Sequence, residues 1–419
     1  MKLLSAAYVL PITSAAILDG GVVVDEGRIL AVGKKTELAN QFPGAQPEEF
    51  PNAVLMPGLV NAHTHLDLLN FDGKGAGGQA VEFFDWLLLS WQHRKKLTPA
   101  ARRQCIDDGI RQLLRAGTTC VGDTGQYVGV IAQAANAPMR MVLFPEMVSG
   151  GDEAALDGFE GAFSQVDEIL DSKSTRLSAG LAPYAAYTLS RHLLKILSQH
   201  ARELRIPFKI HVAETFSEMQ FFYESSGEIA EKIFPALGWG NQLPPEHRKT
   251  PIQYLDAIGF LEGATLVGGN HLAEGDLQMI AKSKARLVHS PRSNARLKLG
   301  TPPIRKLRDL GVRVALGTDS SGALYSLSLW DEMRYILNHY PEAEQPSADD
   351  LLKMATIEGA KALGLGDRIG TLEGGKEADL IAVRLTPEFD PKKLASSLIQ
   401  NTTDREIAAV FVEGKKVKL

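Results

Sequence analysis

The sequence predicts an α/β protein: a closed (β/α)8, TIM-like barrel with a small discontinuous β domain contributed by both chain ends. Within residues 57–369, short β-branched runs alternate with longer amphipathic stretches, which is the pattern of repeated βα units around a parallel sheet. There are eight such runs, and eight strands with intervening helices favour a closed barrel. An open doubly wound sheet is the alternative architecture.

The elements of the expected barrel follow one another along the chain. Stretches at 83–97, 99–117 and 190–205 carry apolar residues near three-and-four spacing, so we expect them to be helices. The expected strands are rich in Val, Ile, Leu and Thr and several of them end in polar residues. In chain order they cover residues 55–65, 118–124, 140–148, 177–184, 207–214, 265–274, 285–294 and 312–320.

The two chain ends have a different pattern. GGVVVDEGRILAVG at 20–33, GTLEGGKEADLIAVR at 370–384 and IAAVFVEGKKVKL at 407–419 are short strand-like runs separated by glycine turns. We therefore expect residues 1–56 and 370–419 to pair into one small β-sandwich domain, with the barrel formed by 57–369.

The composition is that of a soluble folded protein. Of 419 residues, 44% are hydrophobic and 23% are charged, which argues against disorder. Lys and Arg number 45 against 50 Asp and Glu, so a small-molecule substrate is expected, rather than nucleic acid or a membrane surface. The two cysteines are too few for a disulfide framework, and the cytoplasm is the expected location. The sequence does not decide the oligomeric state, and a homodimer is one possible assembly.

The motif His63-Thr64-His65 ends the first expected barrel strand. Residues i and i+2 of a strand point to the same side, so both imidazoles can face one metal. Alone, this motif is weak, because two polar histidines at a strand end are common. His211, His271 and Asp319 also lie at or near expected strand ends, and these ends converge on one face of a barrel. Nitrogen and carboxylate ligands suit one divalent metal, Zn²⁺ first, with Fe²⁺ or Mn²⁺ also suitable.

Several segments resemble the metal-dependent amidohydrolase superfamily: PGLVNAHTHLDL at 57–68, HVAET at 211–215, GTDSS at 317–321 and GGKEADLIAV at 374–383. HVAE at 211–214 and HSPRSNARL at 289–297 resemble the branch that contains guanine, cytosine and S-adenosylhomocysteine deaminases and triazine chlorohydrolases.

This resemblance implies that His63, His65, His211 and Asp319 bind one metal. His271 would stay off the metal, or only weakly on it, and polarise the substrate or the attacking water. Binuclear relatives carry a bridging carboxylated lysine after strand four, whereas the stretch here is LAPYAAYTLS at 181–190, which implies a mononuclear centre.

The resemblance also implies catalytic roles for two carboxylates. A bound metal lowers the pKa of its water from about 15.7 towards about 7, which supplies hydroxide at neutral pH. Asp319 would then take a proton as general base. Glu214, three residues beyond His211, would protonate a ring nitrogen and pass a proton to the leaving amine.

Departures from the pattern concern substrate contacts. Tyr184 stands where deaminase relatives have a histidine, and Arg94 lies near the position of their ribose-binding glutamate. Arg94 and Arg292 would suit a substrate carboxylate, which a guanidinium holds through two hydrogen bonds, although ordinary ion pairs are the alternative for both. His289 either contacts substrate or makes an internal hydrogen bond. Ser320, directly after Asp319, is a further candidate contact.

Together with TPIQYLDAIGFL at 250–261, these departures are similar to deaminases of aminodeoxyfutalosine in the alternative menaquinone pathway. Their substrate is an adenine nucleoside with a benzoate at the 5′ end. The alternatives are another purine or pyrimidine deaminase, a triazine chlorohydrolase, and a binding module without catalysis. Residues 217–260 could form a lid or serve packing alone.

Overall fold

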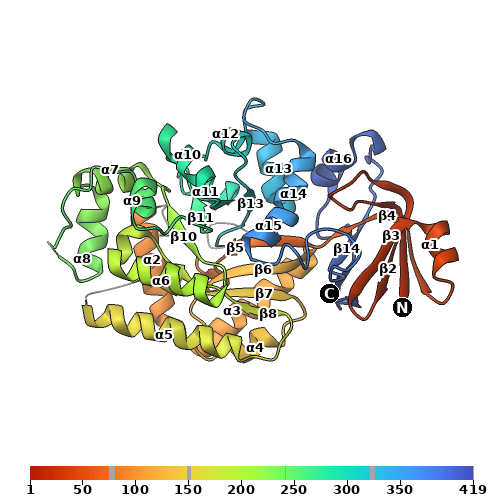
Figure 1. Cartoon of the computed structure of the whole chain (residues 1–419), viewed down its shortest axis with the longest axis horizontal. Helices are drawn as coiled ribbons and strands as arrows, with labels where there is room; N and C mark the ends of the chain where they lie inside the picture. Colours follow the sequence, from red (N-terminus) through yellow and green to blue (C-terminus); the bar gives the residue numbers. More distant parts are fainter. Residues whose placement is uncertain (75–80, 149–151, 241, 321–325, 419) are drawn as a thin grey trace.

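The computed structural model describes residues 1–74, 81–148, 152–240, 242–320 and 326–418, except for the side chains of 152–156. A β-sheet made from both chain ends lies at one side of the molecule, and a larger α/β body forms the rest (Figure 1). Both termini lie beside that sheet. No described helix is long and apolar enough to cross a membrane.

The strands of the larger body are parallel to their neighbours and form two sheets, with orders β5-β6-β7-β8 and β10-β11-β12-β13, while β9 pairs with β7. All eight expected strand regions contain a strand, although most are shorter than expected. The strands are β5 (Leu59–Thr64), β6 (Thr118–Gly125), β7 (Arg140–Met147), β8 (Leu177–Ala179), β9 (Ala182–Pro183), β10 (Lys209–Val212), β11 (Thr265–Gly268), β12 (Arg286–His289) and β13 (Val314–Leu316).

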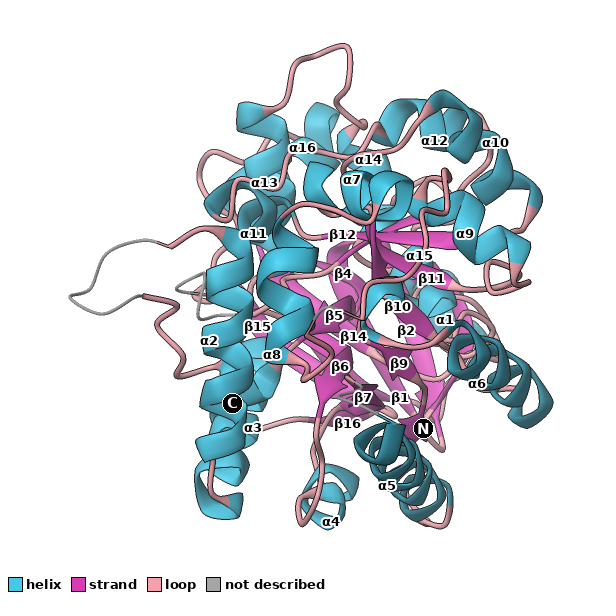
Figure 2. Ribbon diagram, turned by 90° about the vertical axis from the view of Figure 1, so that its left-hand side faces the viewer, coloured by secondary structure: helices cyan, strands magenta, loops and turns pink. Residues whose placement is uncertain are grey.

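Isolated bridges join these two sheets at both edges. Leu181 pairs with Phe208 and Ala185 pairs with His211, which connects the β8–β9 region to β10. At the other edge Thr64 pairs with Asp319, where the backbone amide of Asp319 donates to the carbonyl of His63 at 3.0 Å. The strand order and these bridges are those of the predicted barrel, and Figure 2 shows the strands surrounded by helices.

Helices cover the outside of the strands. Thr98 and Ser190 cap α3 and α6 by accepting hydrogen bonds from Ala101 N and Leu193 N, as their residue types favour. The helices of this body are α2 (Phe83–Lys96), α3 (Pro99–Arg115), α4 (Ile131–Ala135), α5 (Asp152–Leu170), α6 (Arg191–Leu204), α7 (Phe216–Glu224), α8 (Phe234–Ala236), α9 (Pro251–Ala257), α10 (Glu274–Lys282), α11 (Pro291–Arg296), α12 (Ile304–Asp309), α13 (Leu329–His339), α14 (Ala348–Met354) and α15 (Ile357–Ala362). One-turn helices span Leu66–Leu68 and Ala186–Thr188, and a π-helix spans Ile229–Ile233.

The chain ends form one seven-stranded sheet of order β16-β15-β14-β4-β1-β2-β3. Strand β4 pairs with β14, so the N- and C-terminal segments share one hydrogen-bonded sheet. The division of the chain into two domains at 56/57 and 369/370 stays a prediction. The elements are β1 (Lys2–Val9), β2 (Ile17–Asp25), β3 (Arg28–Lys34), α1 (Lys35–Gln41), β4 (Gln46–Pro57), β14 (Leu380–Arg384), the one-turn helix Pro391–Lys393, α16 (Leu394–Asn401), β15 (Ile407–Val412) and β16 (Lys415–Lys416).

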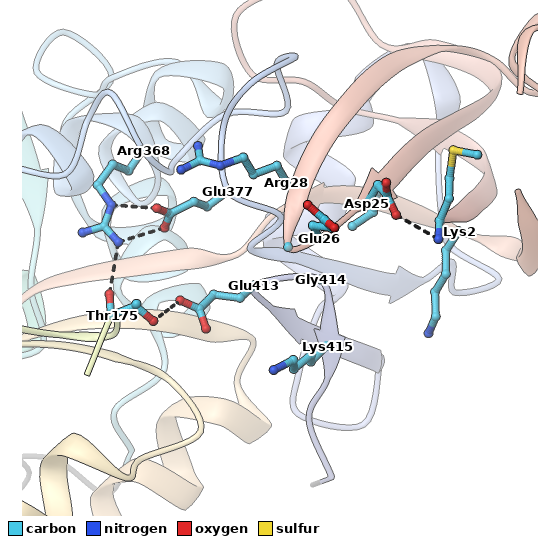
Figure 3. Close-up of a pocket in the computed structure, with 13 residues that line it drawn as sticks. Lys2, Asp25, Glu26, Arg28, Thr175, Arg368, Glu377, Glu413, Gly414 and Lys415 are labelled. Atoms are coloured by element: carbon cyan, nitrogen blue, oxygen red, sulfur yellow. Dashed lines mark hydrogen bonds and ion pairs between the residues drawn. The ribbon is translucent and has the colours of Figure 1, made fainter. Parts of the chain in front are cut away.

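A cleft of about 830 Å³ lies where this sheet meets the segment before β8 (Figure 3). Two of its side-chain contacts are internal hydrogen bonds: Arg368 Nε donates to Glu377 Oε1 at 2.8 Å, and Thr175 Oγ1 donates to Glu413 Oε1 at 2.6 Å. None of the predicted site residues lines the cleft. We therefore place the candidate active site elsewhere.

Arg140 on β7 connects the barrel to the sheet through buried ion pairs. Its Nε and Nη2 donate to the two carboxylate oxygens of Asp379 at 2.7 and 3.0 Å, and Nη2 also lies 2.7 Å from Glu377 Oε2. The side chains of Arg140 and Asp379 are each only 1% exposed, so neither charge has water as an alternative partner.

We expect Arg140→Met to lower the free energy of unfolding by about 3–5 kcal/mol, because it leaves the buried Asp379 carboxylate without its cation. Urea unfolding of both proteins measures the change. Arg176→Met is the control, since Arg176 is 27% exposed and its ion pair with Glu413 contributes about 1 kcal/mol or less. Equal, small losses in both variants would contradict the importance of the buried pair.

Candidate active site

Three of the predicted metal ligands come together at the carboxyl ends of two strands. His63 belongs to β5, His65 follows it directly, and His211 belongs to β10. Their side chains are buried, and each offers one ring nitrogen within 4.8 Å of the nitrogens offered by the other two. The spacing of His63 and His65 places both rings on the inner side, as the strand alternation predicts.

Asp319 completes this group from the segment after β13. Its Oδ1 lies 3.6 Å from both His63 Nε2 and His65 Nε2. Donors bound to one tetrahedral zinc at about 2.0–2.1 Å lie about 3.3 Å apart, so this spacing suits a shared ion. Asp319 has a positive φ of 57°, and Ser293 Oγ donates to its Oδ2 at 2.5 Å. The backbone turn and the serine together fix the direction of the carboxylate.

The donor set fits a divalent metal. Both ring nitrogens of His63 and Nε2 of His211 are buried and have no hydrogen-bond partner among the described residues. Unpaired buried nitrogens cost stability unless a ligand satisfies them. Burial lowers the pKa of His63 and of His65 well below 6.5, so both imidazoles are neutral at pH 7 and can donate a lone pair.

Hydrogen bonds to Nδ1, the ring nitrogen that points away from the metal site, orient the rings of His65 and His211. His65 Nδ1 lies 2.8 Å from the carbonyl oxygen of Thr124 and 2.7 Å from Arg94 Nη2, and both contacts leave Nε2 free to face the metal site. His211 Nδ1 lies 3.1 Å from Glu214 Oε1, a carboxylate oxygen that can accept its hydrogen bond, so Nε2 of His211 is also free. Such partners fix the ring orientation of metal-binding histidines.

Glu214 reaches His211 through a tight turn after β10. Ala213 has a positive φ of 51°, and Asn270 Nδ2 donates to the carbonyl oxygen of Glu214 at 3.3 Å. Gly268 faces this side chain: a Cβ added there would lie 2.6 Å from Glu214 Cγ. The carboxyl group is thereby held at the wall of the same cavity as Asp319.

The cavity beside these groups is narrow and has one apolar wall. Its free volume is about 20 Å³, close to the space that one water molecule needs. Of the residues that α2 contributes, the predictions included Arg94 but not Phe83, Trp86, Leu87 or Ser90, although these follow the histidine motif closely in the sequence. The lining residues are His65, Leu68, Phe83, Trp86, Leu87, Ser90, Arg94, Tyr184, His211, Glu214, Leu299 and Asp319.

Tyr184 lines the cavity as predicted, and Arg94 also lines it but is not free to bind a carboxylate. The ring centroid of Tyr184 lies 4.9 Å from that of His211. Arg94 Nε lies 3.0 Å from Asp67 Oδ2, and its Nη1 lies 2.5 Å from Glu146 Oε2. These two buried carboxylates pair with the guanidinium, and its Nη2 lies 2.7 Å from His65 Nδ1. The pairs are buried, whereas the alternative for Arg94 was an ordinary ion pair at the surface.

Arg292 also departs from the prediction. Pro291 begins α11, so Arg292 lies in the first turn of a helix rather than on a strand. Its Nη1 donates to Ser326 Oγ at 3.1 Å and forms ion pairs with Asp331 and Glu332 at 3.4 and 3.5 Å. It does not line the described cavity. The guanidinium therefore pairs with the first turn of α13, and a contact between Arg292 and a substrate carboxylate stays a prediction.

The other candidates, His289, His271 and Ser320, are not part of the described lining of the cavity. His289 is buried, with Nε2 2.6 Å from Tyr340 Oη, and burial lowers its pKa to about 3, so it makes the internal hydrogen bond. His271 Nε2 donates to the carbonyl oxygen of Leu299 at 3.1 Å, outside the histidine cluster. Ser320 is buried beside Asp319, and its Oγ has no partner among the described residues.

Residues 217–260 contribute nothing to the described lining of the cavity. They fold mainly into α7, the π-helix at Ile229–Ile233, α8 and α9.

Comparisons with known proteins agree with this architecture. The model of the amidohydrolase family matches residues 54–417, and that of the bacterial imidazolonepropionase-like composite domain matches residues 20–45. A 5-methylthioadenosine/S-adenosylhomocysteine deaminase of Desulfitobacterium hafniense is 29% identical, with 99% of this chain and 92% of the relative covered.

Two solved structures have the same fold. The adenosine deaminase from Xanthomonas campestris with bound zinc has a TM-score of 0.84 at 28% identity, covering 99% of this chain and 92% of the other. The aminofutalosine deaminase of Helicobacter pylori in complex with methylthio-coformycin has a TM-score of 0.85 at 24% identity, covering 100% of both chains. The match over residues 54–417 shows that the chain belongs to the amidohydrolase family, whose hydrolytic enzymes act on carbon–nitrogen bonds.

Proposed function

We propose that the protein is a zinc-dependent deaminase that replaces the exocyclic amine of the adenine ring in a 5′-substituted nucleoside. The observation that carries this proposal is the position of Glu214, whose carboxyl group faces the same cavity as Asp319 and the histidine cluster. The relatives named for methylthioadenosine, S-adenosylhomocysteine and adenosine support the substrate class.

The three clustered histidines, Asp319 and Glu214 each have a task in this reaction. His63, His65, His211 and Asp319 would hold a divalent metal, which would supply hydroxide at neutral pH because such an ion lowers the pKa of water from about 15.7 to about 7. Asp319 accepts a proton at its carboxylate while Ser293 holds Oδ2. Glu214 protonates a ring nitrogen and passes a proton to the leaving amine, as a positioned general acid and base.

The apolar wall suits an uncharged aromatic ring. Leu68 from the one-turn helix after β5, and Phe83, Trp86 and Leu87 from α2, line the cavity together with Leu299. Since both predicted arginines are held by carboxylates of the protein, the described lining offers no free guanidinium to a substrate anion. We therefore place nucleosides with a neutral 5′ substituent, such as 5′-methylthioadenosine, first.

Aminodeoxyfutalosine is the second candidate. It shares the adenine ring, and Tyr184 at the cavity, in place of the histidine expected in other relatives, favours a substrate whose 5′ part differs from theirs. Its benzoate would meet no unpaired guanidinium in the described lining, where Arg94 is already paired with Asp67 and Glu146.

A substrate panel tests both candidates with zinc-loaded protein. We expect 5′-methylthioadenosine to be converted to its inosine analogue, with kcat/KM at least about tenfold above that of aminodeoxyfutalosine, since a charged hydrogen bond worth about 1.5–3 kcal/mol is missing. The absorbance change from adenine to hypoxanthine measures the rates, and assays of ammonia and chloride cover guanine, cytosine and a chlorotriazine.

Arg292→Met serves as the control and should change KM for either nucleoside by less than about threefold. A selective loss of the carboxylated nucleoside in this variant would restore the role that the sequence predicted. Turnover of guanine, cytosine or the chlorotriazine without any nucleoside would overturn the proposed substrate class.

A further inference from the structure

A second buried glutamate, Glu218, lies directly behind Glu214. It occupies the first turn of α7 and is 2% exposed. Thr215 caps this helix by accepting from Glu218 N at 3.2 Å. In an ordinary capping box, the glutamate at this position reaches back to the backbone amide of the cap residue. Here its Oε2 accepts from the backbone amide of Glu214 at 3.1 Å, one residue further back.

The segment that Glu218 reaches is a strained turn. Ala213 adopts a positive φ of 51°, a conformation that costs a residue with a side chain about 1 kcal/mol or more. Such a conformation persists only when its surroundings hold it. The carbonyl oxygens of Ala213 and Glu214 accept from His271 N at 2.9 Å and Asn270 Nδ2 at 3.3 Å. Glu218 stabilises the same turn by accepting a hydrogen bond from the backbone amide of Glu214.

The orientation of Glu214 depends on this turn. Its side chain must leave the backbone towards His211 Nδ1, 3.1 Å from Oε1, and towards the cavity. If the backbone amide of Glu214 lost its hydrogen bond to Glu218, Ala213 would be able to relax to an ordinary negative φ. The carboxyl group would then leave its place beside the histidine cluster.

We propose that Glu218 is a positioning residue that holds the backbone of Glu214, so that the Glu214 carboxyl group stays aimed at the cavity. The inference rests on the proposed function, in which Glu214 transfers protons.

The protonation state of Glu218 agrees with a purely positional role. Burial, together with the charge of Glu214, raises the pKa of Glu218 to about 8, so it is mostly a neutral carboxylic acid at pH 7. A neutral group does not place a second negative charge beside Glu214, yet its carbonyl oxygen can still accept the N–H. Glutamine has the same shape and the same acceptor, whereas alanine has none.

The test compares Glu218→Gln, Glu218→Ala and the control Glu231→Ala, which removes an exposed carboxylate from the nearby π-helix. For each variant we would measure bound zinc, kcat and KM with the best nucleoside of the panel. We expect Glu218→Ala to keep one zinc and a KM within about threefold, while kcat falls about 10- to 100-fold, as is typical when a supporting partner is lost. Glu218→Gln should restore kcat to within about threefold, and the control should match the parent protein.

A kcat of Glu218→Ala close to that of the parent would overturn the proposal, and so would equal losses in the alanine and glutamine variants. Crystal structures of both variants test it without any substrate: Glu214 Oε1 should leave His211 Nδ1 in the alanine variant and stay in the glutamine variant. An unmoved Glu214 in the alanine variant would overturn the proposal. If the parent protein deaminates no nucleoside, the proposed function fails, while these structures still decide whether Glu218 positions Glu214.

Discussion

Replacing Glu214 by glutamine is expected to remove most of the turnover while the protein keeps its metal. The amide oxygen can still accept from His211 Nδ1, which now lies 3.1 Å from Glu214 Oε1, so the histidine stays oriented. An amide cannot take up and release a proton, and general acid–base catalysis typically contributes about 100- to 10,000-fold. We therefore expect kcat to fall by that factor.

Steady-state kinetics and metal analysis of Glu214→Gln measure both parts of this expectation. Glu203→Gln is a matched control because Glu203 is 74% exposed on α6, far from catalysis in the proposed mechanism. A loss of less than about threefold in Glu214→Gln would remove Glu214 from the mechanism. Loss of the metal from Glu214→Gln would instead indicate that Glu214 acts only by orienting His211.

Replacing His63 by alanine is expected to abolish both metal binding and activity. His63 is fully buried, its ring nitrogens have no partner among the described residues, and its Nε2 lies 3.6 Å from Asp319 Oδ1. Its removal leaves three of four predicted ligands and a cavity that water can enter. Elemental analysis should find less than one tenth of the metal of the parent protein, and turnover should be at background.

His289→Ala is the control for this prediction. His289 is equally buried at the end of β12, yet it bonds to Tyr340 instead of facing the cluster, so its variant should retain one metal. Retention of one metal by His63→Ala, or two metals in the parent protein, would contradict the mononuclear site.

The sequence predicted the strands and the histidine cluster because both depend on local rules. Alternation in a strand places His63 and His65 on one side, and parallel strands of a barrel bring His211 to the same end. The positions of these residues needed no knowledge of side-chain packing. The strand-end positions had already singled out Asp319 and His271, although the structure places His271 outside the histidine cluster. The family resemblance added Glu214 and the role of each residue.

The substrate contacts were harder to predict because they depend on partners that are distant in sequence. Arg94 is neutralised by Asp67 and Glu146, which lie on a one-turn helix after β5 and on β7, and no local pattern joins these three residues. Arg292 is different: Ser290-Pro291 is a recognisable helix start, so reading 285–294 as one strand overlooked an available signal.

The bridge between Thr64 and Asp319 has a thermodynamic consequence. It joins the first barrel strand to the segment after the last one, and the proposed metal ligands His63, His65 and Asp319 lie on its two sides. An ion held there would connect the first strand of the barrel to the segment after the last strand, at the point where the barrel closes. By mass action, a ligand that binds only the folded state stabilises it in proportion to the logarithm of its free concentration. Metal occupancy and closure of the barrel would then be linked equilibria. The concentration of available zinc would therefore set the fraction of chains that are folded as well as the rate of turnover.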